Sequence, residues 1–304
     1  MRLTILQRLK SASDYISGQQ LSRELQVSRA AINKHIMALR DMGYQIESIT
    51  NRGYRLQDKQ MINQLELELL VRAGGYPVTP VFYETIDSTN RAAKQMVPPG
   101  LIVALEQTHG KGRRGRDWIS AKGQGLYVSL VLMPQLPPEV ISAITQLAGL
   151  CVAKAIGPEA RIKWPNDVYI KDKKASGILT ELVTQADLIE KLIIGIGVNF
   201  NPVNDMDTAT SLAEQGKDLS MIEFLDQFLK LWFQAYPQFL EQPDLSYWLE
   251  EINQRSLLQN KSVQISGIDD VGTFLGIDAQ GHAIIEGESR HMLSYGEISL
   301  KGWK

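Results

Sequence analysis

Short apolar runs of strand length dominate residues 81–200, and this pattern constrains the fold of the 304-residue chain more than any other feature. The runs are VFYETI, LIVALE, GLYVSLVLM, VYIK, SGILTEL and KLIIGIGVNF. A helical stretch at 139–157 lies among them, and a second one follows at 221–240. Because many connections have hairpin length and few are long crossovers, we predict an α+β fold built on a mixed sheet.

The chain is too long for one ordinary domain, so two or three domains are expected. Its single cysteine, Cys151, can form no internal disulfide, which fits a reducing compartment, and its apolar neighbours favour a buried, inert thiol. The N-terminal segment lacks the apolar core of a signal peptide, and no apolar run approaches the roughly 18 residues of a membrane span. We therefore expect a cytoplasmic protein with no membrane partner.

Positive charge is concentrated at the N-terminal end. Residues 1–60 hold 10 Lys or Arg against 5 Asp or Glu, whereas the remaining residues hold 22 against 29. Helix-start signals stand at Ser17 and Ser28, only a few residues separate the two predicted helices, and a two-stranded wing with a turn at 51–53 follows. The pattern predicts a winged helix-turn-helix domain over residues 1–60, with a polar linker at 57–62.

The helix after Ser28 has the pattern of a recognition helix. Ile32, Ile36 and Leu39 share one stripe, so the residues opposite them would face a major groove, with the wing arginines near phosphate. The predicted DNA contacts are Ser28, Arg29, Ala30, Asn33, Lys34, Arg52 and Arg55. The alternative is a small protein-interaction domain whose Lys and Arg side chains are merely solvated.

A glycine-rich loop at 110–116, here called the cationic loop, carries Lys111 and three arginines between three glycines. It contains the dinucleotide-binding pattern G-x-G-x-x-G, but the run at 125–133 reads as a strand and not as a helix, so this assignment fails. A surface loop of solvated arginines is the alternative. Because so many glycines make a loop entropically costly unless something orders it, we favour a phosphate-bearing ligand that the loop covers.

Three further polar clusters accompany the predicted strands. DSTN offers hydroxyl and amide groups for a neutral head group, or else Ser88 is simply a helix N-cap. RIKWPNDVYI places Lys163 and Asp167 beside a proline turn, where Asp167 could hold Mg²⁺ against phosphates or form only an Asx turn. In KDKKASGIL, small residues after Lys174 leave room for a ligand, so this lysine is expected to point inward.

The ordered set of motifs resembles the biotin protein ligases, and specifically the bifunctional bacterial type that also represses the biotin operon. The motifs are SRAAINKHI, STN, GKGRRGR, KWPNDVY, KASGIL and GIGVNFN, in family order and spacing over nearly the whole chain. The resemblance implies a winged helix-turn-helix domain at 1–60, a class II synthetase-like catalytic domain at 61–257 and a small SH3-like β barrel at 258–304. Short strands with turns such as that at 278–281 agree with the last of these.

The resemblance also implies a two-step reaction. The biotin carboxylate attacks the α-phosphate of ATP, bound with Mg²⁺, and gives biotinyl-5′-AMP and pyrophosphate. A lysine of the biotin carboxyl carrier protein of acetyl-CoA carboxylase then attacks the activated carbonyl and releases AMP. In this family biotinyl-5′-AMP is also the corepressor, and with it bound the chain would form a homodimer that binds palindromic biotin operator DNA.

The resemblance assigns roles to individual residues. Lys174, Arg113 and Asp167 would be catalytic, with Lys174 at the carboxylate and phosphoryl centre. The positions implied for biotin or biotinyl-AMP binding are Ser88, Thr89, Asn90, Gln107, Gly110, Lys111, Gly112, Arg113, Arg114, Gly115, Arg116, Trp118, Lys163, Lys174, Gly177 and Asn199. Trp118 and Asn199 would lie on the adenine side. Many relatives carry Arg at the position of Lys111, where a point charge replaces a bidentate fork.

Three alternative functions stay open on the sequence alone. They are a transcription factor that senses biotin without catalysis, a ligase whose N-terminal domain has no repressor activity, and a lipoate ligase. Lys174 and Asp167 argue against the first alternative, and a lipoate ligase is not expected to carry a winged domain.

Overall fold

The computed structural model describes residues 1–304 except 58–61, 186, 203–206, 267–270 and 301–304. Contacts divide the chain into two compact units, Met1–Ala73 and Gly74–Lys304. Each unit is organised around its own buried residues.

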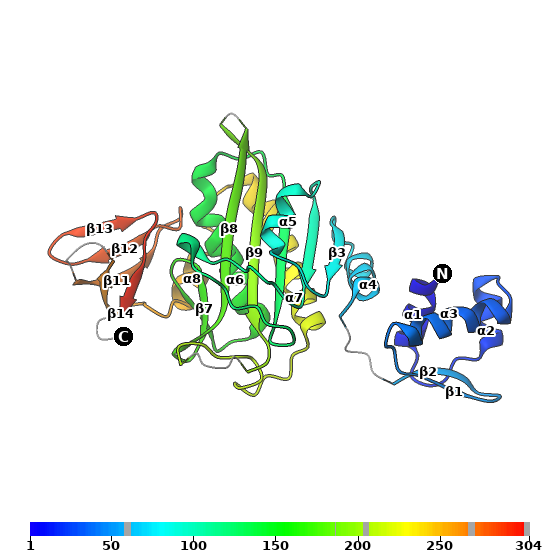
Figure 1. Cartoon of the computed structure of the whole chain (residues 1–304). Coiled ribbons are helices and arrows are strands. Elements are labelled where there is room, and N and C mark those ends of the chain that lie inside the picture. Colours follow the sequence, from blue (N-terminus) through cyan, green and yellow to red (C-terminus); the bar gives the residue numbers. More distant parts are fainter. Residues whose placement is uncertain (58–61, 186, 203–206, 267–270, 301–304) are drawn as a thin grey trace. The chain divides into compact units, whose positions relative to one another are not determined.

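The first unit is a winged helix-turn-helix domain, as the sequence predicts (Figure 1). Its elements are α1 (Arg2–Ser11), α2 (Gly18–Leu25), α3 (Arg29–Asp41), β1 (Ile46–Ile49), β2 (Gly53–Leu56) and α4 (Gln64–Gly74). The Ser17 and Ser28 hydroxyls cap α2 and α3 by accepting backbone N–H bonds from the first turn of each helix. Strands β1 and β2 form the antiparallel wing, whose turn contains Asn51 at φ 66°.

Helix α4 packs with this first unit. Its Leu69 belongs to the same buried cluster as Ile32 of α3. The buried carboxylate of Glu66 forms an ion pair of 2.6 Å with Lys10 and accepts a hydrogen bond of 3.0 Å from the Tyr44 hydroxyl. Apolar and charged contacts therefore join α4 to the winged domain.

These contacts place the first boundary later than the sequence does. The sequence places it at residue 60, ahead of α4, whereas the contacts group the chain up to Ala73 with the winged domain. Residues 58–61 of the predicted linker lie outside the described residues. The boundary at 257 stays a prediction, because both sides of it belong to the second unit.

A seven-stranded sheet with the order β3-β4-β5-β9-β8-β7-β6 forms the centre of the second unit. Its strands are β3 (Thr79–Tyr83), β4 (Gly100–Ala104), β5 (Gly125–Leu132), β6 (Ala160–Lys163), β7 (Asp167–Ile170), β8 (Lys173–Gln185) and β9 (Leu188–Asn199). Strands β3 and β4 are parallel, and the other neighbouring pairs are antiparallel. The prediction of a mixed sheet is therefore confirmed.

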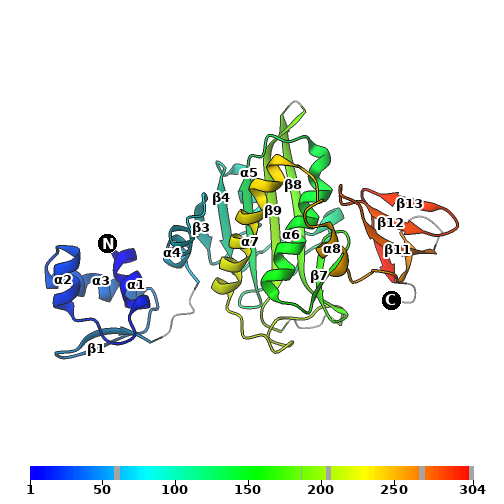
Figure 2. The same cartoon turned by 180° about the vertical axis from the view of Figure 1, so that it is seen from behind.

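Helices cover both faces of this sheet. Helix α5 (Thr89–Gln95) lies on one face against β4, β5 and β9 (Figure 1), while α6 (Ile141–Ile156) and α7 (Met221–Glu241) lie side by side on the other face, seen in front in Figure 2. The segment Pro138–Ile156 is long and apolar enough to cross a membrane, contrary to the prediction that no run approaches that length. Because 72% of its most apolar window is buried inside the protein, we assign it as a core helix.

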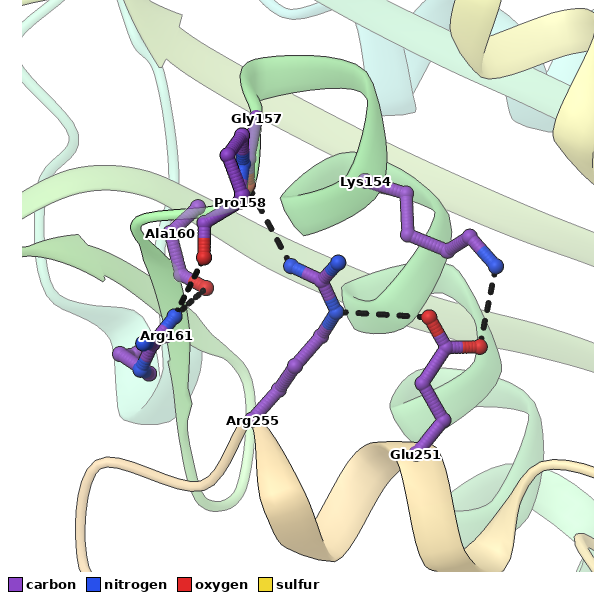
Figure 3. Close-up of polar contacts among 7 residues, drawn as sticks. All are labelled: Lys154, Gly157, Pro158, Ala160, Arg161, Glu251 and Arg255. Atoms are coloured by element: carbon purple, nitrogen blue, oxygen red, sulfur yellow. Dashed lines mark hydrogen bonds and ion pairs between the residues drawn. The ribbon is translucent and has the colours of Figure 1, made fainter.

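Helix α8 (Leu249–Gln254) precedes the C-terminal strands and is fixed by charged contacts (Figure 3). Glu251 of α8 accepts a hydrogen bond of 2.9 Å from Lys154 of α6, and it pairs with Arg255 at 3.4 Å. Arg255 also donates to the carbonyl of Gly157 at 3.3 Å. These contacts attach α8 to the end of α6, so the C-terminal strands start from a defined place beside the large sheet.

The C-terminal part is an antiparallel five-stranded sheet with the order β13-β12-β11-β10-β14. Its strands are β10 (Ser262–Ile265), β11 (Val271–Ile277), β12 (Ala283–Glu286), β13 (Arg290–Leu293) and β14 (Ile298–Leu300). The predicted turn at 278–281 is present, because the Gly281 amide donates to the Asp278 carbonyl at 3.0 Å. The predicted run of short strands is confirmed, and the SH3-like barrel stays a prediction.

Candidate functional site

A cavity of about 400 Å³ lies where the start of α5, the cationic loop, the β6–β7 turn and strands β8 and β9 meet. Three residues of the C-terminal part, Ser266, Glu297 and Ile298, also line it. The cavity gathers polar residues that are far apart in the sequence, which is typical of a small-molecule site.

Ser88 and Thr89 begin helix α5 at one end of this cavity, and both are buried. The Ser88 hydroxyl accepts a bond of 3.4 Å from the Arg91 amide, which confirms that Ser88 is an N-cap. The side-chain oxygen of Gln107 accepts from the Thr89 backbone amide at 2.8 Å and from its hydroxyl at 3.1 Å, and the Gln107 nitrogen donates to Ser120 at 3.0 Å. This end of the cavity therefore presents hydroxyl and amide groups, which suit a neutral, hydrogen-bonding head group.

Asn90 borders the same end, but its amide is bonded to protein groups. Its Nδ2 donates to the Leu179 carbonyl at 3.2 Å and to the Glu181 carboxylate at 2.7 Å, and its Oδ1 accepts from the Ser129 hydroxyl at 2.6 Å. An amide nitrogen has only two N–H groups, and both are used here. The Asn90 side chain, which the sequence analysis assigns to ligand binding, therefore bonds to residues of the sheet.

The cationic loop is folded as a tight turn. The Trp118 amide donates to the Gly110 carbonyl at 3.0 Å, and the Gly112 amide donates to the Arg116 carbonyl at 2.7 Å. Between these bonds lies a short 3₁₀ turn, Arg113–Gly115. The sequence analysis expected a bound ligand to order this loop. Hydrogen bonds within the loop backbone already order part of it.

Arg113 extends from this turn over the cavity and is half-buried. It donates to the side-chain oxygen of Asn166 at 3.3 Å and to the Gly296 carbonyl at 3.2 Å. Desolvation by burial lowers the pKa of the Arg113 guanidinium, which nevertheless stays charged at neutral pH. Both hydrogen-bond acceptors are neutral, and the nearby carboxylates of Glu297 and Asp167 favour the charged form of this side chain, which can hold an anion in the cavity.

Lys174 points into the cavity, as the sequence predicts. Its Nζ lies 2.7 Å from Oδ1 of Asp167 and 5.0 Å from the centroid of the Trp118 ring. The pairing of β7 with β8 shifts register where Tyr169 pairs with Lys174. Such a bulge breaks the regular alternation of side chains and can re-aim one of them, here the lysine.

Lys163 brings a second ammonium group to the cavity. It pairs in register with Asp167 across β6 and β7, and its Nζ lies 3.4 Å from the Tyr169 hydroxyl. Desolvation by burial lowers the pKa of Lys163, while the Asp167 charge opposes that shift. Five Lys or Arg and three Asp or Glu line the cavity, so its wall suits a ligand that carries negative charge.

The Trp118 indole covers a pair of glycines on the sheet. Gly177 of β8 pairs with Gly197 of β9, and a Cβ atom at Gly197 would lie 2.6 Å from the indole ring. Only glycine lets the ring approach the strands so closely. The indole Nε1 is buried and has no hydrogen-bond partner among the described residues, so it offers a donor to a bound molecule.

Thirteen of the seventeen predicted catalytic or ligand-binding residues line the cavity. They are Ser88, Thr89, Asn90, Gln107, Lys111, Gly112, Arg113, Arg116, Trp118, Lys163, Asp167, Lys174 and Gly177. Gly110, Arg114 and Gly115 belong to the cationic loop but not to the cavity wall. Asn199 is buried and does not line the cavity, and its amide donates to the Thr210 carbonyl at 3.1 Å.

Gly195, Gly197 and Glu297 are among the cavity residues that sequence reasoning missed. The alternating glycines of GIGVN were an available signal, because glycine inside a strand often marks the close approach of another group. Glu297 pairs with Arg116 at 2.8 Å and with Arg114 at 3.6 Å. No local pattern points to it, since it lies 181 positions from Arg116.

The described residues contain no group of three or more His, Cys, Asp or Glu side chains that could hold a metal ion. Asp167, the predicted Mg²⁺ contact, offers one carboxylate, whose Oδ1 pairs with Lys174. A single carboxylate can bind Mg²⁺ if phosphate oxygens and water supply most of the other ligands of the ion.

In the first unit, the predicted DNA contacts of α3 lie on its exposed face. These exposed residues are Ser28, Arg29, Ala30, Asn33 and Lys34. In the wing, Arg52 pairs with Asp14 at 3.2 Å, and the guanidinium carbons of Arg52 and Arg55 lie 4.3 and 5.9 Å from the centroid of the Tyr15 ring. The aromatic ring and the acidic neighbour thus hold both arginines beside the turn of the wing.

Known protein families match both the winged domain and the region that holds much of the cavity. Residues 82–199 match the biotin/lipoate A/B protein ligase family, and residues 2–55 match an HTH domain. The bifunctional ligase/repressor BirA of Bacillus subtilis (strain 168) is 32% identical over 297 residues, which cover 91% of each chain. The bifunctional ligase/repressor BirA of Escherichia coli (strain K12) is 31% identical over 311 residues, which cover 96% of this chain and 95% of that protein.

A solved structure has a similar fold over most of the chain. The biotin protein ligase from Aquifex aeolicus in complex with biotin and ATP is 33% identical, with a TM-score of 0.61, and the match covers 73% of this chain and 98% of the other. The bifunctional relatives match nearly the whole chain, winged domain included. On this evidence the chain belongs to the bifunctional ligase/repressor family of biotin protein ligases.

Proposed function

We propose that the chain activates biotin with ATP to biotinyl-5′-AMP and then transfers biotin to a lysine of the biotin carboxyl carrier protein of acetyl-CoA carboxylase. The observation that carries this proposal is one cavity that joins a hydroxyl- and amide-lined end to Lys174 and the cationic loop. The related ligase solved with biotin and ATP supports the choice of substrates.

In the first step, Ser88, Thr89 and Gln107 would hold the ureido head group, which needs both donors and acceptors. The biotin carboxylate would then face Lys174. One carboxylate oxygen attacks the α-phosphorus of ATP, the bond from that phosphorus to the bridging oxygen breaks, and pyrophosphate leaves. Lys174 and Arg113 would stabilise the charge on the phosphoryl oxygens, which is the main contribution that a protein makes to such a transfer.

In the second step, the neutral amine of the acceptor lysine attacks the carbonyl carbon of the mixed anhydride. The bond between that carbon and the phosphate oxygen breaks, AMP leaves, and the nitrogen loses a proton as the amide forms. Because the anhydride hydrolyses readily, the cationic loop and Trp118 would exclude water until the carrier protein arrives.

Mg²⁺ would accompany ATP. Asp167 would supply a single protein carboxylate, and phosphate oxygens and water would complete the coordination. The chemistry that the ion supplies is neutralisation of phosphate charge.

We also propose that the winged domain binds biotin operator DNA when biotinyl-5′-AMP is bound. The exposed polar face of α3 supports this role, because a recognition helix reads base edges in the major groove. Biotinyl-5′-AMP would act as corepressor by binding the homodimer-competent state more tightly. A two-fold homodimer would match a palindromic operator. Partners such as DNA and a carboxylase subunit would support a cytoplasmic location.

Two alternatives have less support. The biotin--[acetyl-CoA-carboxylase] ligase of Paracoccus denitrificans matches 71% of this chain over 98% of its own length, which raises the alternative of a ligase without repressor activity. The HTH match at residues 2–55 favours repression for this chain. A lipoate ligase shares the family of the central match, but the bifunctional relatives support biotin.

Pyrophosphate release tests the ligase proposal. The purified chain is mixed with ATP, Mg²⁺ and either biotin or lipoate, and labelled biotin is then followed onto a carrier protein and onto a carrier variant whose acceptor lysine is replaced by arginine. We expect release with biotin and label on the lysine-bearing carrier alone. Pyrophosphate release with lipoate but not with biotin would instead identify the chain as a lipoate ligase.

Sedimentation and DNA binding test the repressor proposal. We expect biotin together with ATP to increase both self-association and binding to a fragment from upstream of biotin genes. Binding should weaken with salt, because phosphate contacts release counterions. Association that is unchanged by biotin and ATP would contradict the corepressor role.

A further inference from the structure

A buried polar network ties helix α5 to three adjacent strands through Asn90, the second residue of that helix. Ser129 of β5, Gly195 of β9 and Leu179 of β8 lie in register, so they form a row across the sheet. The Asn90 amide spans this row, because it accepts from the Ser129 hydroxyl on one side and donates to the Leu179 carbonyl on the other. Its position is therefore set by two strands at once.

Gly195, in the middle of the row, provides the space for the amide. A Cβ atom at this position would lie 2.2 Å from Oδ1 of Asn90 and 2.8 Å from both Cγ and Nδ2. Any larger residue would thus push Asn90, and with it the start of α5, away from the sheet.

Glu181 extends the network along α5. One of its carboxylate oxygens accepts from Nδ2 of Asn90 at 2.7 Å, and the other forms an ion pair of 2.7 Å with Lys94. Asn90 and Lys94 are four residues apart, so they share one face of the helix. A single strand residue therefore holds two successive turns of α5.

The neighbour of Asn90 is held from a different direction. Thr89 bonds to Gln107 through both its backbone amide and its hydroxyl. Two adjacent residues at the start of α5 are thus fixed to two different parts of the fold, which leaves the helix terminus little freedom to shift or rotate. Ser88, which precedes them, is the N-cap and borders the same cavity.

We propose that Asn90 is a positioning residue: held by Ser129, Leu179 and Glu181, it sets the place of the Ser88 and Thr89 hydroxyls, and so the affinity for the substrate head group. This inference rests on the proposed function, in which those hydroxyls bind the ureido group of biotin. Asn90 acts through its neighbours, since both of its N–H donors serve the protein.

Ser129→Ala is the sharpest test. Ser129 is fully buried and lies outside the cavity wall, and its hydroxyl bonds to Asn90, so the loss of this hydroxyl acts on the substrate through Asn90. Thr145→Val is the matched control, because the Thr145 hydroxyl links α6 to Thr180 of β8 at 2.9 Å. Each variant removes one hydroxyl that ties a helix to the sheet, fully buried at Ser129 and half-buried at Thr145. Asn90→Ala removes all three side-chain hydrogen bonds of Asn90, to Ser129, Leu179 and Glu181.

The readouts are KM for biotin, KM for ATP and kcat in pyrophosphate release, together with thermal unfolding. We expect KM for biotin to rise about tenfold in Asn90→Ala, as for one hydrogen bond lost to a buried polar head group, with KM for ATP unchanged. Ser129→Ala should raise KM for biotin in the same direction but less. Thr145→Val should lower the unfolding temperature without changing either KM.

Wild-type KM for biotin in both Ser129→Ala and Asn90→Ala would overturn the proposal. Equal rises in both KM values, or a rise in Thr145→Val as large as in Ser129→Ala, would also overturn it, because the network would then be only structural. If Asn90→Ala does not fold, Ser129→Ala decides alone. Absence of biotin-dependent release in the wild-type chain would instead refute the proposed function.

Discussion

Replacing Arg113 by alanine separates the role of the cationic loop in holding the reaction intermediate from any role in the fold. The guanidinium lines the cavity, and its protein contacts are two long hydrogen bonds, at 3.3 and 3.2 Å, to neutral oxygens. A hydrogen bond from a charged donor contributes up to about 3 kcal/mol to the free energy of unfolding, and solvent screening at this half-buried side chain reduces that value, so the variant should lose a few kcal/mol at most and stay folded.

The effect on the adenylate should be larger. A hydrogen bond to a charged group contributes about 1.5–3 kcal/mol. Losing one bond to the phosphate would therefore accelerate adenylate release by about 10- to 150-fold. Biotin affinity should change little, because Ser88, Thr89 and Gln107 lie at the opposite, uncharged end of the proposed substrate.

The release rate can be measured directly. Labelled adenylate is formed on the protein, free substrates are removed by desalting, and loss of label is followed after addition of unlabelled biotinyl-5′-AMP. Arg114→Ala is the matched control, since Arg114 belongs to the same loop but lies outside the cavity wall and pairs with Glu297 at 3.6 Å. Release from Arg113→Ala at the wild-type rate, or equal acceleration in both variants, would refute the role given to Arg113.

Three further predictions concern other parts of the molecule. Lys174→Gln should lower kcat for biotin-dependent pyrophosphate release by about 10²- to 10³-fold, the usual cost of removing one stabilising donor, while calorimetry still detects biotin binding; an unchanged kcat would exclude this lysine from the phosphoryl centre. Burial raises the pKa of Cys151 to about 12, so at pH 8 iodoacetamide should label this cysteine only after denaturation. Labelling of the native chain, detected by mass spectrometry, would contradict its burial. Lys34→Ala should reduce the slope of log affinity for operator DNA against log salt concentration by about 0.9, as for one lost phosphate contact. A slope equal to that of the wild type would show that Lys34 contacts no phosphate.

Sequence patterns were sufficient where short-range interactions decide the structure. The winged domain follows from caps at Ser17 and Ser28, one turn between helices and a wing turn at Asn51, all of which act over a few residues. The inward direction of Lys174 was predictable for a similar reason, because the small residues after it permit the bulge that turns it.

The features that local sequence patterns did not predict depend on long-range interactions. Glu297, which lies just before β14 at the far end of the chain, reaches the cationic loop, and α4 joins the winged domain through a buried carboxylate, Glu66. Asn90 and Asn199 show a related limit, because polar residues in motifs were assigned to the ligand although their amides bond the protein. Which partner a buried amide takes depends on strand register, and register is not visible in a local motif.

The most direct test is a crystal structure of the chain with biotinyl-5′-AMP bound. The account predicts the ureido group at Ser88, Thr89 and Gln107, the phosphate within hydrogen-bond distance of Lys174 and Arg113, and the cationic loop closed over the acyl phosphate. An adenylate bound elsewhere, or a loop that leaves the phosphate in solvent with Lys174 turned away, would contradict it.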